Sequence, residues 1–290
     1  MCRTFLGSTG ILCFVVAFVM HRHVSSVARK AEQIVRLDKQ TYDTRWATVL
    51  ADPDNVAQLR RLQGVVDKLR SPRVVNPADY DHNEKGADKR IVRVRVETLR
   101  TLQQHAGGRS TSWGGGGAKP TKPRQLHGDL PYLYAQAHAL NPYFQARMYQ
   151  WAGQAKSTVV HHCGVKQQRR AIDKTWRCYA GDATRLLDLV RGSITCRTVR
   201  GIMECLACIE ADPAVFVLNV KNRFDPRYDG HTTAGYRNLA LLLVIVDAET
   251  ARLGVHDHVC ELQLGLTQIN ELKTAGGHHN YRKWRDMRAV

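Results

Sequence analysis

The sequence has few acidic side chains for its length. Its 290 residues contain 26 Asp and Glu against 43 Lys and Arg, which gives a formal net charge of +17. This excess favours partners that carry phosphate, namely nucleotides, RNA or an anionic membrane surface; the alternative is a solvated basic surface with no partner. Hydrophobic residues at 43% and charged residues at 24% are ordinary for a globular protein, so the chain can bury a core.

Two familiar ligand-binding patterns are incomplete. Cys205 and Cys208 form a C-x-x-C pair, but no second pair and no ligand-spaced His pair accompanies it, so we expect a half-buried helix, no structural metal and mostly reduced thiols. The four consecutive glycines within residues 107 to 124 have no strand before them and no GK[ST] after them. That context excludes a phosphate-binding loop and predicts a flexible linker.

The apolar run near the N-terminus is short. It covers residues 11 to 20, whereas a membrane span needs about 20 residues, and it lies between Arg3 and the polar residues 21 to 23. No clear small-x-small cleavage site follows it. The interpretations are a cleaved targeting signal, an uncleaved anchor with the basic residues 27 to 30 on the cytoplasmic side, or a buried helix. We expect residues 1 to 26 to be a targeting or anchor segment.

The remaining chain divides into three parts by composition. Residues 27 to 106 predict charged helices, although residues 91 to 96 alternate as a strand would; residues 107 to 125 predict the linker, and residues 126 to 290 a folded domain. In that domain we expect a helix interrupted at Asn141 and Pro142, a second helix, a strand from 186 to 196, a third helix, three strands and a closing helix. This order predicts an α/β (α+β) fold with a mixed sheet flanked by helices, the last strands pairing antiparallel.

Two acidic residues interrupt apolar strand patterns. Asp188 does so in RLLDLVRGSI and Glu261 in HVCELQL. Two carboxylates aimed at one face from neighbouring strands would bind Mg²⁺ together with a nucleotide triphosphate, because a hard cation takes carboxylate and phosphate oxygens. Taken singly, either acid is more often a cap, an ion-pair partner or an edge residue.

Basic residues recur before and among these strands. Lys166, Arg170 and Lys174 are spaced by four residues, which places them on one stripe of a helix, and Lys221 and Arg223 add positive charge close to the strands. Such a group can hold triphosphate oxygens opposite a metal, as phosphoryl transfer requires. The alternative is a stripe that simply faces water.

The order of several short motifs resembles a known family. Lys166 and Lys174 eight residues apart, LDLVRGSI, KNRF, GYRNL, CELQL and GGHHNYRKW are together similar to the RelA/SpoT-type nucleotidyltransferase domain, the fold of (p)ppGpp synthetases, over about residues 155 to 290. The resemblance implies Mg²⁺ on Asp188 and Glu261, with Gln263 beside the latter. It also implies ATP phosphates on Lys166 and Lys174, an acceptor guanine stacked on Tyr236, and a substrate contact from His278.

The functional hypothesis is a magnesium-dependent nucleotide pyrophosphokinase or nucleotidyltransferase that uses ATP and a guanine nucleotide (GDP or GTP) or an RNA acceptor. Three positions depart from the family pattern: Ala240 stands where synthetases usually have histidine, Gly164 where they commonly have arginine, and the acid before the closing segment is displaced or replaced around Lys273. These departures motivate an alternative, a catalytically degenerate nucleotide- or RNA-binding module on the same fold. A third hypothesis is RNA binding alone, with stacking from Trp113, Trp151, Trp176 and Trp284.

Overall fold

The structure is a computed structural model that describes residues 2–70, 89–106, 122–155 and 158–273. Three helices come first: α1 (Cys2–Leu50), α2 (Pro53–Arg70) and α4 (Lys89–Ala106). The alternating residues 91 to 96 therefore belong to a helix. Leu99 and Leu102 of α4 are buried against the sheet, which stabilises the helical alternative.

A mixed sheet forms the centre of the domain. In chain order the following elements are α5 (Leu130–Gln154), β1 (Thr158–His161), α6 (Gln168–Tyr179), β2 (Arg191–Cys196), α7 (Val199–Ala211), β3 (Val215–Asn222), β4 (Leu239–Ile245), α8 (Ala248–Arg252), β5 (Cys260–Leu266) and α9 (Thr267–Asn270). The strand order is β1-β2-β5-β4-β3, with β2 and β5 parallel and the other neighbours antiparallel. The predicted fold class is confirmed.

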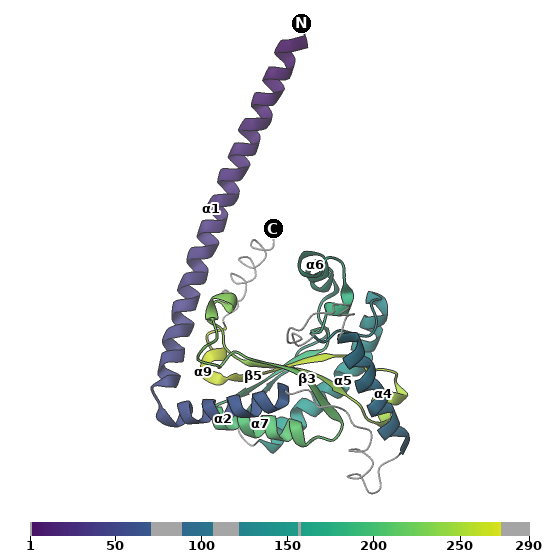
Figure 1. The fold of residues 1–290 in the computed structure, drawn as a ribbon. Coiled ribbons are helices and arrows are strands. Elements are labelled where there is room, and N and C mark those ends of the chain that lie inside the picture. The colour runs from purple at the N-terminus through teal and green to yellow at the C-terminus, as the bar shows by residue number, and fades with distance from the viewer. Residues whose placement is uncertain (1, 71–88, 107–121, 156–157, 274–290) are drawn as a thin grey trace, which may run out of the picture.

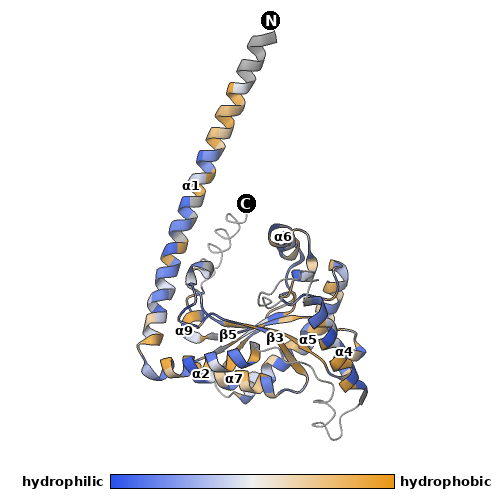
Figure 2. Ribbon diagram, viewed as in Figure 1, coloured by the Kyte–Doolittle hydropathy of each residue, from blue (hydrophilic) through white to orange (hydrophobic). Residues whose placement is uncertain are grey.

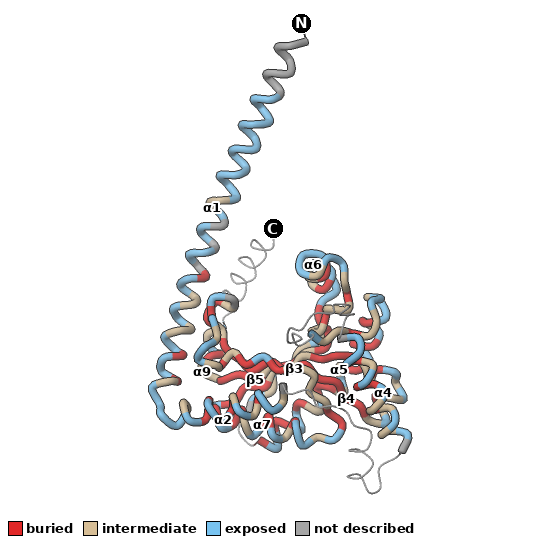
Figure 3. The backbone as a smooth tube through the Cα atoms, in the orientation of Figure 1, coloured by how far each residue is buried: buried red, intermediate tan, exposed pale blue. Residues whose placement is uncertain are grey.

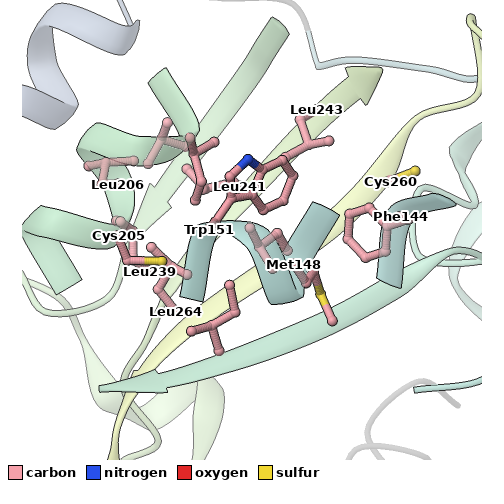
Figure 4. Packing of buried hydrophobic residues seen from close by; sticks show 14 of the residues in the cluster. Phe144, Met148, Trp151, Cys205, Leu206, Leu239, Leu241, Leu243, Cys260 and Leu264 are labelled. Carbon is pink, nitrogen blue, oxygen red and sulfur yellow. The ribbon is translucent and has the colours of Figure 1, made fainter. Parts of the chain in front are cut away.

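One face of the sheet is the main hydrophobic core. Ile194 of β2, Leu241 of β4 and Leu262 of β5 alternate onto this face and are fully buried. Helices α5, α7 and α2 cover it (Figure 1). The close-up shows Phe144, Met148 and Trp151 of α5 packed among the leucines of β4 and β5 (Figure 4). This cluster fixes the sheet, and with it the positions of the side chains on the opposite face.

The opposite face is divided between an apolar end and a polar end. At the apolar end Leu242, Val244 and Val259 pack with Leu99 and Leu102 of α4. At the other end the strand register brings polar side chains together, because partners at the same level of a sheet point to the same face. We call this region the polar sheet face; it comprises Arg191, Ser193 and Thr195 of β2, Lys221 and Arg223 at the end of β3, Asn238 before β4, and Glu261 and Gln263 of β5.

The structure differs from the local predictions in three places. Helix α5 continues through Pro142, because the helix buries Leu140, Phe144 and Met148 and this burial outweighs the cost of one lost hydrogen bond, about 3 kcal/mol. The short strand β1 was not anticipated. The closing helix is only Thr267–Asn270 within the described residues.

The N-terminal half of α1 stands apart from the domain. The window Gly10–Val27 has a mean hydropathy of 1.6, and none of it is buried. Figures 2 and 3 show this apolar, exposed half rising away from the sheet. The buried-helix interpretation is therefore wrong, and one helix of the described chain is long and apolar enough to cross a membrane. The cysteines from Cys13 to Cys260 are free thiols.

A buried histidine next to β5 gives the fold a pH-dependent stability. His258 is 1% exposed, and burial lowers its pKa to about 4. Between pH 6.5 and 4 the unfolded chain binds a proton at this residue and the folded chain does not, so the free energy of unfolding falls as the pH falls through this window.

We expect a loss of about 3 kcal/mol between pH 6.5 and pH 4 from this group. Urea unfolding of the wild type and of His258→Gln across that range measures it, and the variant should show the smaller slope. His231→Gln removes an exposed histidine and should leave the profile unchanged. Equal profiles for His258→Gln and the wild type would contradict the assignment.

Candidate functional site

Two lysines converge on Asp188 at the edge of the polar sheet face. Lys166 Nζ lies 2.5 Å from Asp188 Oδ2, and Lys174 Nζ lies 3.1 Å from Asp188 Oδ1. All three side chains are largely withdrawn from solvent, with 8%, 23% and 13% of Lys166, Lys174 and Asp188 exposed. Each carboxylate oxygen therefore has its own ammonium partner.

Backbone contacts explain how residues from three segments meet here. The Lys166 N–H donates to the carbonyl of Leu189, and the Tyr134 hydroxyl of α5 donates to the carbonyl of Lys166. Lys166 thus lies in the loop before α6, and only Arg170 and Lys174 of the predicted stripe lie on the helix. Asp188 lies three residues before β2. The carbonyl of Leu186 accepts a hydrogen bond from the Gln125 side chain and that of Leu189 from the Lys166 N–H, so this segment does not pair with a neighbouring strand. The prediction that Asp188 interrupts a strand was wrong.

The charges of this cluster stabilise one another against burial. Burial disfavours the carboxylate of Asp188, but the ammonium groups of Lys174 and Lys166 outweigh it and hold its pKa at about 2. Burial lowers the pKa of Lys166 in spite of Asp188, whereas at Lys174 the attraction of Asp188 and Tyr179 outweighs burial and raises the pKa. The cluster carries two cations for one anion, so it retains positive charge that can meet a phosphate.

Glu261 lies on the adjacent strand with its side chain on the polar sheet face. Its backbone N–H donates to Val190, two residues after Asp188, and it is paired in register with Arg191. Among the described residues its carboxylate makes no hydrogen bond and no ion pair. The two acids are thus neighbours in the sheet with different surroundings, one held by lysines and one available to a ligand.

The far side of the polar sheet face is basic. Lys221 has an exposed side chain that still loses part of its hydration on the sheet. This partial desolvation, together with the positive charge of Arg223, lowers the pKa of Lys221. Arg223 donates to the side chain of Asn238 at 2.6 Å, and Asn238 donates to Gln263 at 3.1 Å. This chain of contacts fixes Arg223 and Gln263 beside Glu261, with cations on both sides of that carboxylate.

Tyr236 lies at the rim of the polar sheet face, where other residues enclose it. Its hydroxyl donates to Asn270 at 2.9 Å, the Tyr42 ring of α1 makes an edge contact at 5.8 Å between centroids, and Lys273 Nζ lies 4.9 Å from the ring centre. Burial raises the pKa of its hydroxyl. A base that stacks on Tyr236 therefore has to replace Tyr42 or Lys273.

Gly235 allows α1 to approach this rim. Its φ is +82°, and a Cβ here would lie 2.8 Å from the Tyr42 Cβ and 3.1 Å from the Lys39 carbonyl. Gly254 has a similar φ of +67° with open space around it, so it serves as a matched control. We expect Gly254→Ala to cost about 1 kcal/mol of unfolding free energy from strain, and Gly235→Ala roughly 2–4 kcal/mol from strain plus overpacking.

Urea unfolding compares the two glycine variants, and amide exchange in the second half of α1 reports whether the helix has separated from the rim. Faster exchange in Gly235→Ala and not in Gly254→Ala is the expected result. Equal costs and unchanged exchange would mean that α1 is not held at this glycine.

Sequence reasoning missed several residues of the site. Asn270 bridges the rim by donating to Thr195 at 2.8 Å while accepting from Tyr236, and Tyr42 comes from a helix that the sequence placed in another region. Arg191 could have been found, since it is three residues from Asp188 on the strand that pairs with Glu261. The predicted His278 lies outside the described residues, and Arg170 lies one turn before Lys174 on α6.

Asp188 and Glu261 are the two acids that the sequence analysis assigned to a metal. The described residues contain no group of three or more His, Cys, Asp or Glu side chains placed to hold an ion. Mg²⁺ is usually bound by one or two carboxylates, phosphate oxygens and water, so a larger protein cage is not required. Glu261 fits this donor set. Asp188 would fit it if Lys166 and Lys174 exchanged their contacts with its carboxylate for contacts with phosphate oxygens.

Comparisons with known proteins address the fold. No protein-family model matches the chain, and no curated protein matches its sequence. Among solved structures, the chain is similar to small alarmone synthetase 1 from Bacillus subtilis bound to its product pppGpp, with 14% identity, a TM-score of 0.41, and coverage of 56% of this chain and 90% of that one. A GTP pyrophosphokinase family protein from Streptococcus pneumoniae has 17% identity, a TM-score of 0.39, and coverage of 55% and 80%.

Small alarmone synthetase 2 from Bacillus subtilis is a further similar structure, with 18% identity, a TM-score of 0.37, and coverage of 53% of this chain and 79% of that one. At such identities a likeness concerns the fold and not the reaction. Two of these similar structures are alarmone synthetases and one is a GTP pyrophosphokinase family protein, the class of protein that the sequence motifs resemble.

Proposed function

We propose that the polar sheet face binds ATP and transfers its pyrophosphate, or a nucleotidyl group, to a guanine nucleotide or RNA acceptor in the manner of a (p)ppGpp synthetase. The observation that carries the proposal is the cluster of Lys166, Lys174 and Asp188 beside an available Glu261. Phosphoryl chemistry needs cations around a group on which negative charge develops, and this face supplies them from several elements.

The residues take different roles in this proposal. Lys166, Arg170 and Lys174 hold the donor phosphates, so the two lysines exchange part of their contact with Asp188 for phosphate oxygens. Lys221 and Arg223 approach the same group from β3, while Gln263 and Asn238 keep Arg223 in place. No general base is evident on the polar sheet face, so positioning and charge neutralisation would supply most of the rate.

Glu261 and Asp188 are the residues that would hold Mg²⁺ with the triphosphate. When bound, the ion would neutralise phosphate charge and favour departure of the leaving group. Tyr236 would offer the acceptor base an aromatic surface after Lys273 or Tyr42 has moved from it.

A transfer assay tests the proposal directly. The full chain with Mg²⁺ and ATP labelled in its terminal phosphates is offered GDP, GTP and tRNA, and we expect label in one acceptor. Binding of ATP, measured separately, distinguishes an inactive site from an empty one. Normal ATP binding with no labelled acceptor would contradict the transferase hypothesis.

One observation favours the second candidate, a nucleotide-binding module without turnover. Both oxygens of Asp188 already face ammonium groups, so its charge is compensated without a metal. In that case a nucleotide should raise the melting temperature of the wild type, Asp188→Asn and Glu261→Gln by equal amounts, and no acceptor should be labelled. Unequal shifts would favour metal-assisted binding.

We also propose that α1 anchors the protein in a membrane through Gly10–Val27. This window is exposed, apolar and followed by the exposed Arg29 and Lys30, which suit the cytoplasmic side of a bilayer. Flotation of the full chain with lipid vesicles, resistant to alkaline extraction, is the expected result. Recovery of the protein in the soluble fraction would contradict the anchor.

A further inference from the structure

The outer face of α6 exposes apolar and basic side chains together. Trp176 is 71% exposed and Ile172 39%, and Arg169 and Arg177 are exposed on the same helix. Arg169, Ile172, Asp173 and Trp176 follow helical spacing and so lie along one stripe, on which Asp173 is the single acid. The inner face of α6 buries Ala171 and Thr175 and directs Lys174 to Asp188. The proposed nucleotide site therefore leaves the outer stripe unused.

The exposed tryptophan has a defined position. A Cβ added at Gly181, whose φ is +85°, would lie 3.3 Å from the Trp176 ring, so the ring packs beside this turn rather than extending freely. Single exposed apolar residues are common on soluble proteins and need no partner. Trp176 and Ile172 alone therefore indicate no partner, and the other features on the same side of the molecule decide whether they have one.

The apolar half of α1 lies on that side. The second half of α1 is fixed to the rim of the polar sheet face through Tyr42, Gly235 and Tyr236, and the helix then runs away from the sheet. Figure 1 shows α6 rising from the same side of the sheet as α1, whereas α2, α5 and α7 lie on the other side. The window Gly10–Val27 and α6 thus lie on the same side of the sheet.

The helix geometry places a bilayer within reach of the domain. The 18 residues of the window rise by about 27 Å, close to the 30 Å of a hydrocarbon core. From Val27 to Tyr42 the helix rises by about 22 Å, which leaves a short distance between the bilayer surface and the rim. An element that stands up from the sheet on this side is therefore directed at the headgroups.

We propose that the outer face of α6, formed by Arg169, Ile172, Trp176 and Arg177, is a second contact with the membrane and binds the surface of an anionic bilayer. Tryptophan suits the boundary between headgroups and acyl chains, and arginine is attracted to anionic headgroups. RNA is the other polyanion that this face could meet, but the aliphatic Ile172 in the middle of the stripe suits acyl chains better than bases. The contact turns the polar sheet face towards the membrane surface.

Bromolipid quenching of tryptophan fluorescence tests the contact. The full chain is reconstituted in phosphatidylcholine vesicles with and without phosphatidylglycerol, each with acyl-brominated lipid. We expect stronger quenching with the anionic lipid, and we expect Trp176→Phe to remove most of that increase. If Trp176→Phe leaves the quenching unchanged, the inference is overturned.

A charge-reversal pair tests the arginines. Arg169→Glu with Arg177→Glu should abolish the additional quenching by anionic lipid. Arg60→Glu with Arg61→Glu makes the same charge change at exposed positions of α2, across the sheet, and should keep it. Equal losses in both pairs would indicate a general charge effect and overturn the specific contact.

The remaining outcomes separate this inference from the proposals on which it depends. It rests on insertion of α1, so protein that does not float with either vesicle overturns it together with the anchor. Protein that floats while Trp176 stays unquenched overturns the α6 contact alone. Salt-sensitive RNA binding that the Arg169 and Arg177 pair abolishes, with unchanged lipid quenching, assigns the face to RNA instead. Transfer to a nucleotide acceptor in the detergent-solubilised chain is independent of all these results.

Discussion

Replacement of Asp188 by asparagine is expected to lower the free energy of unfolding by about 3 kcal/mol. The change leaves the ammonium groups of Lys166 and Lys174, 8% and 23% exposed, without the anion that compensates them. Breaking a buried ion pair from one side is strongly destabilising because the remaining charge stays desolvated. Urea unfolding at neutral pH measures the loss.

Two further variants make this result specific. Asp173→Asn removes an exposed carboxylate of α6 and should change stability little. Adding Lys166→Met to Asp188→Asn should recover part of the loss, and the double-mutant cycle gives the coupling between the two residues. A cost below about 0.5 kcal/mol for Asp188→Asn would mean that the cluster is solvated and that its charges are not coupled.

The contribution of Asp188 to the free energy of unfolding decreases as the pH falls, whereas that of a lysine whose pKa is raised by an ion pair decreases as the pH rises. The pKa of Asp188 is about 2 in the folded chain, below its ordinary value of 3.8. The contribution of this group to stability is therefore complete above about pH 4 and is lost as the pH falls towards 2. It does not overlap the window of His258, so the two groups can be separated in one acid titration.

The second large effect is expected at Glu261, and it concerns activity. Glu261→Gln keeps the shape of the side chain and removes a carboxylate that makes no hydrogen bond and no ion pair with the described residues. We expect the rate of label transfer from ATP to fall by roughly 10²- to 10³-fold, because a group that stabilises charge in the transition state is lost. The free energy of unfolding should change by less than about 0.5 kcal/mol, since no hydrogen bond or ion pair among the described residues is broken.

Glu204→Gln is the matched control for that experiment. Glu204 is exposed on α7, which covers the other face of the sheet, so its replacement should leave both transfer and stability unchanged. Transfer at the wild-type rate in Glu261→Gln would remove this residue from the mechanism. A large loss of stability would show instead that the carboxylate has a structural role.

The two acids thus differ in a way that their sequence contexts did not reveal. Both interrupt apolar runs, and the family resemblance gave both to a metal. The structure surrounds Asp188 with lysines, so its removal should affect folding, and leaves Glu261 available, so its removal should affect chemistry.

The sequence was sufficient where a pattern is local. The strands β3, β4 and β5 follow from alternating or continuous apolar runs, because side chains alternate across a strand whatever the rest of the fold does. The same alternation placed Glu261 and Gln263 on one face together. The antiparallel order of these strands follows from their short connections.

The sequence was insufficient where burial or a distant partner decides the conformation. Pro142 remains within α5 because Phe144 and Met148 need the core, and the alternating residues of α4 are helical because Leu99 and Leu102 pack on the sheet. The start of β2 at Arg191 depends on hydrogen bonds from Gln125 and Lys166, which are far from it in the sequence.

By itself the sequence determined the mixed sheet, the excess of positive charge and the residue types of the polar sheet face, since these depend on spacing and composition. Only the tertiary structure decided that both lysines meet Asp188, that the Tyr42 ring of α1 contacts Tyr236, and that α6 and the apolar half of α1 lie on the same side of the sheet. The physical reason is that these contacts join segments that are distant in the sequence. They form only after the main hydrophobic core has fixed the positions of the strands, and no local pattern of residues encodes the geometry of such contacts.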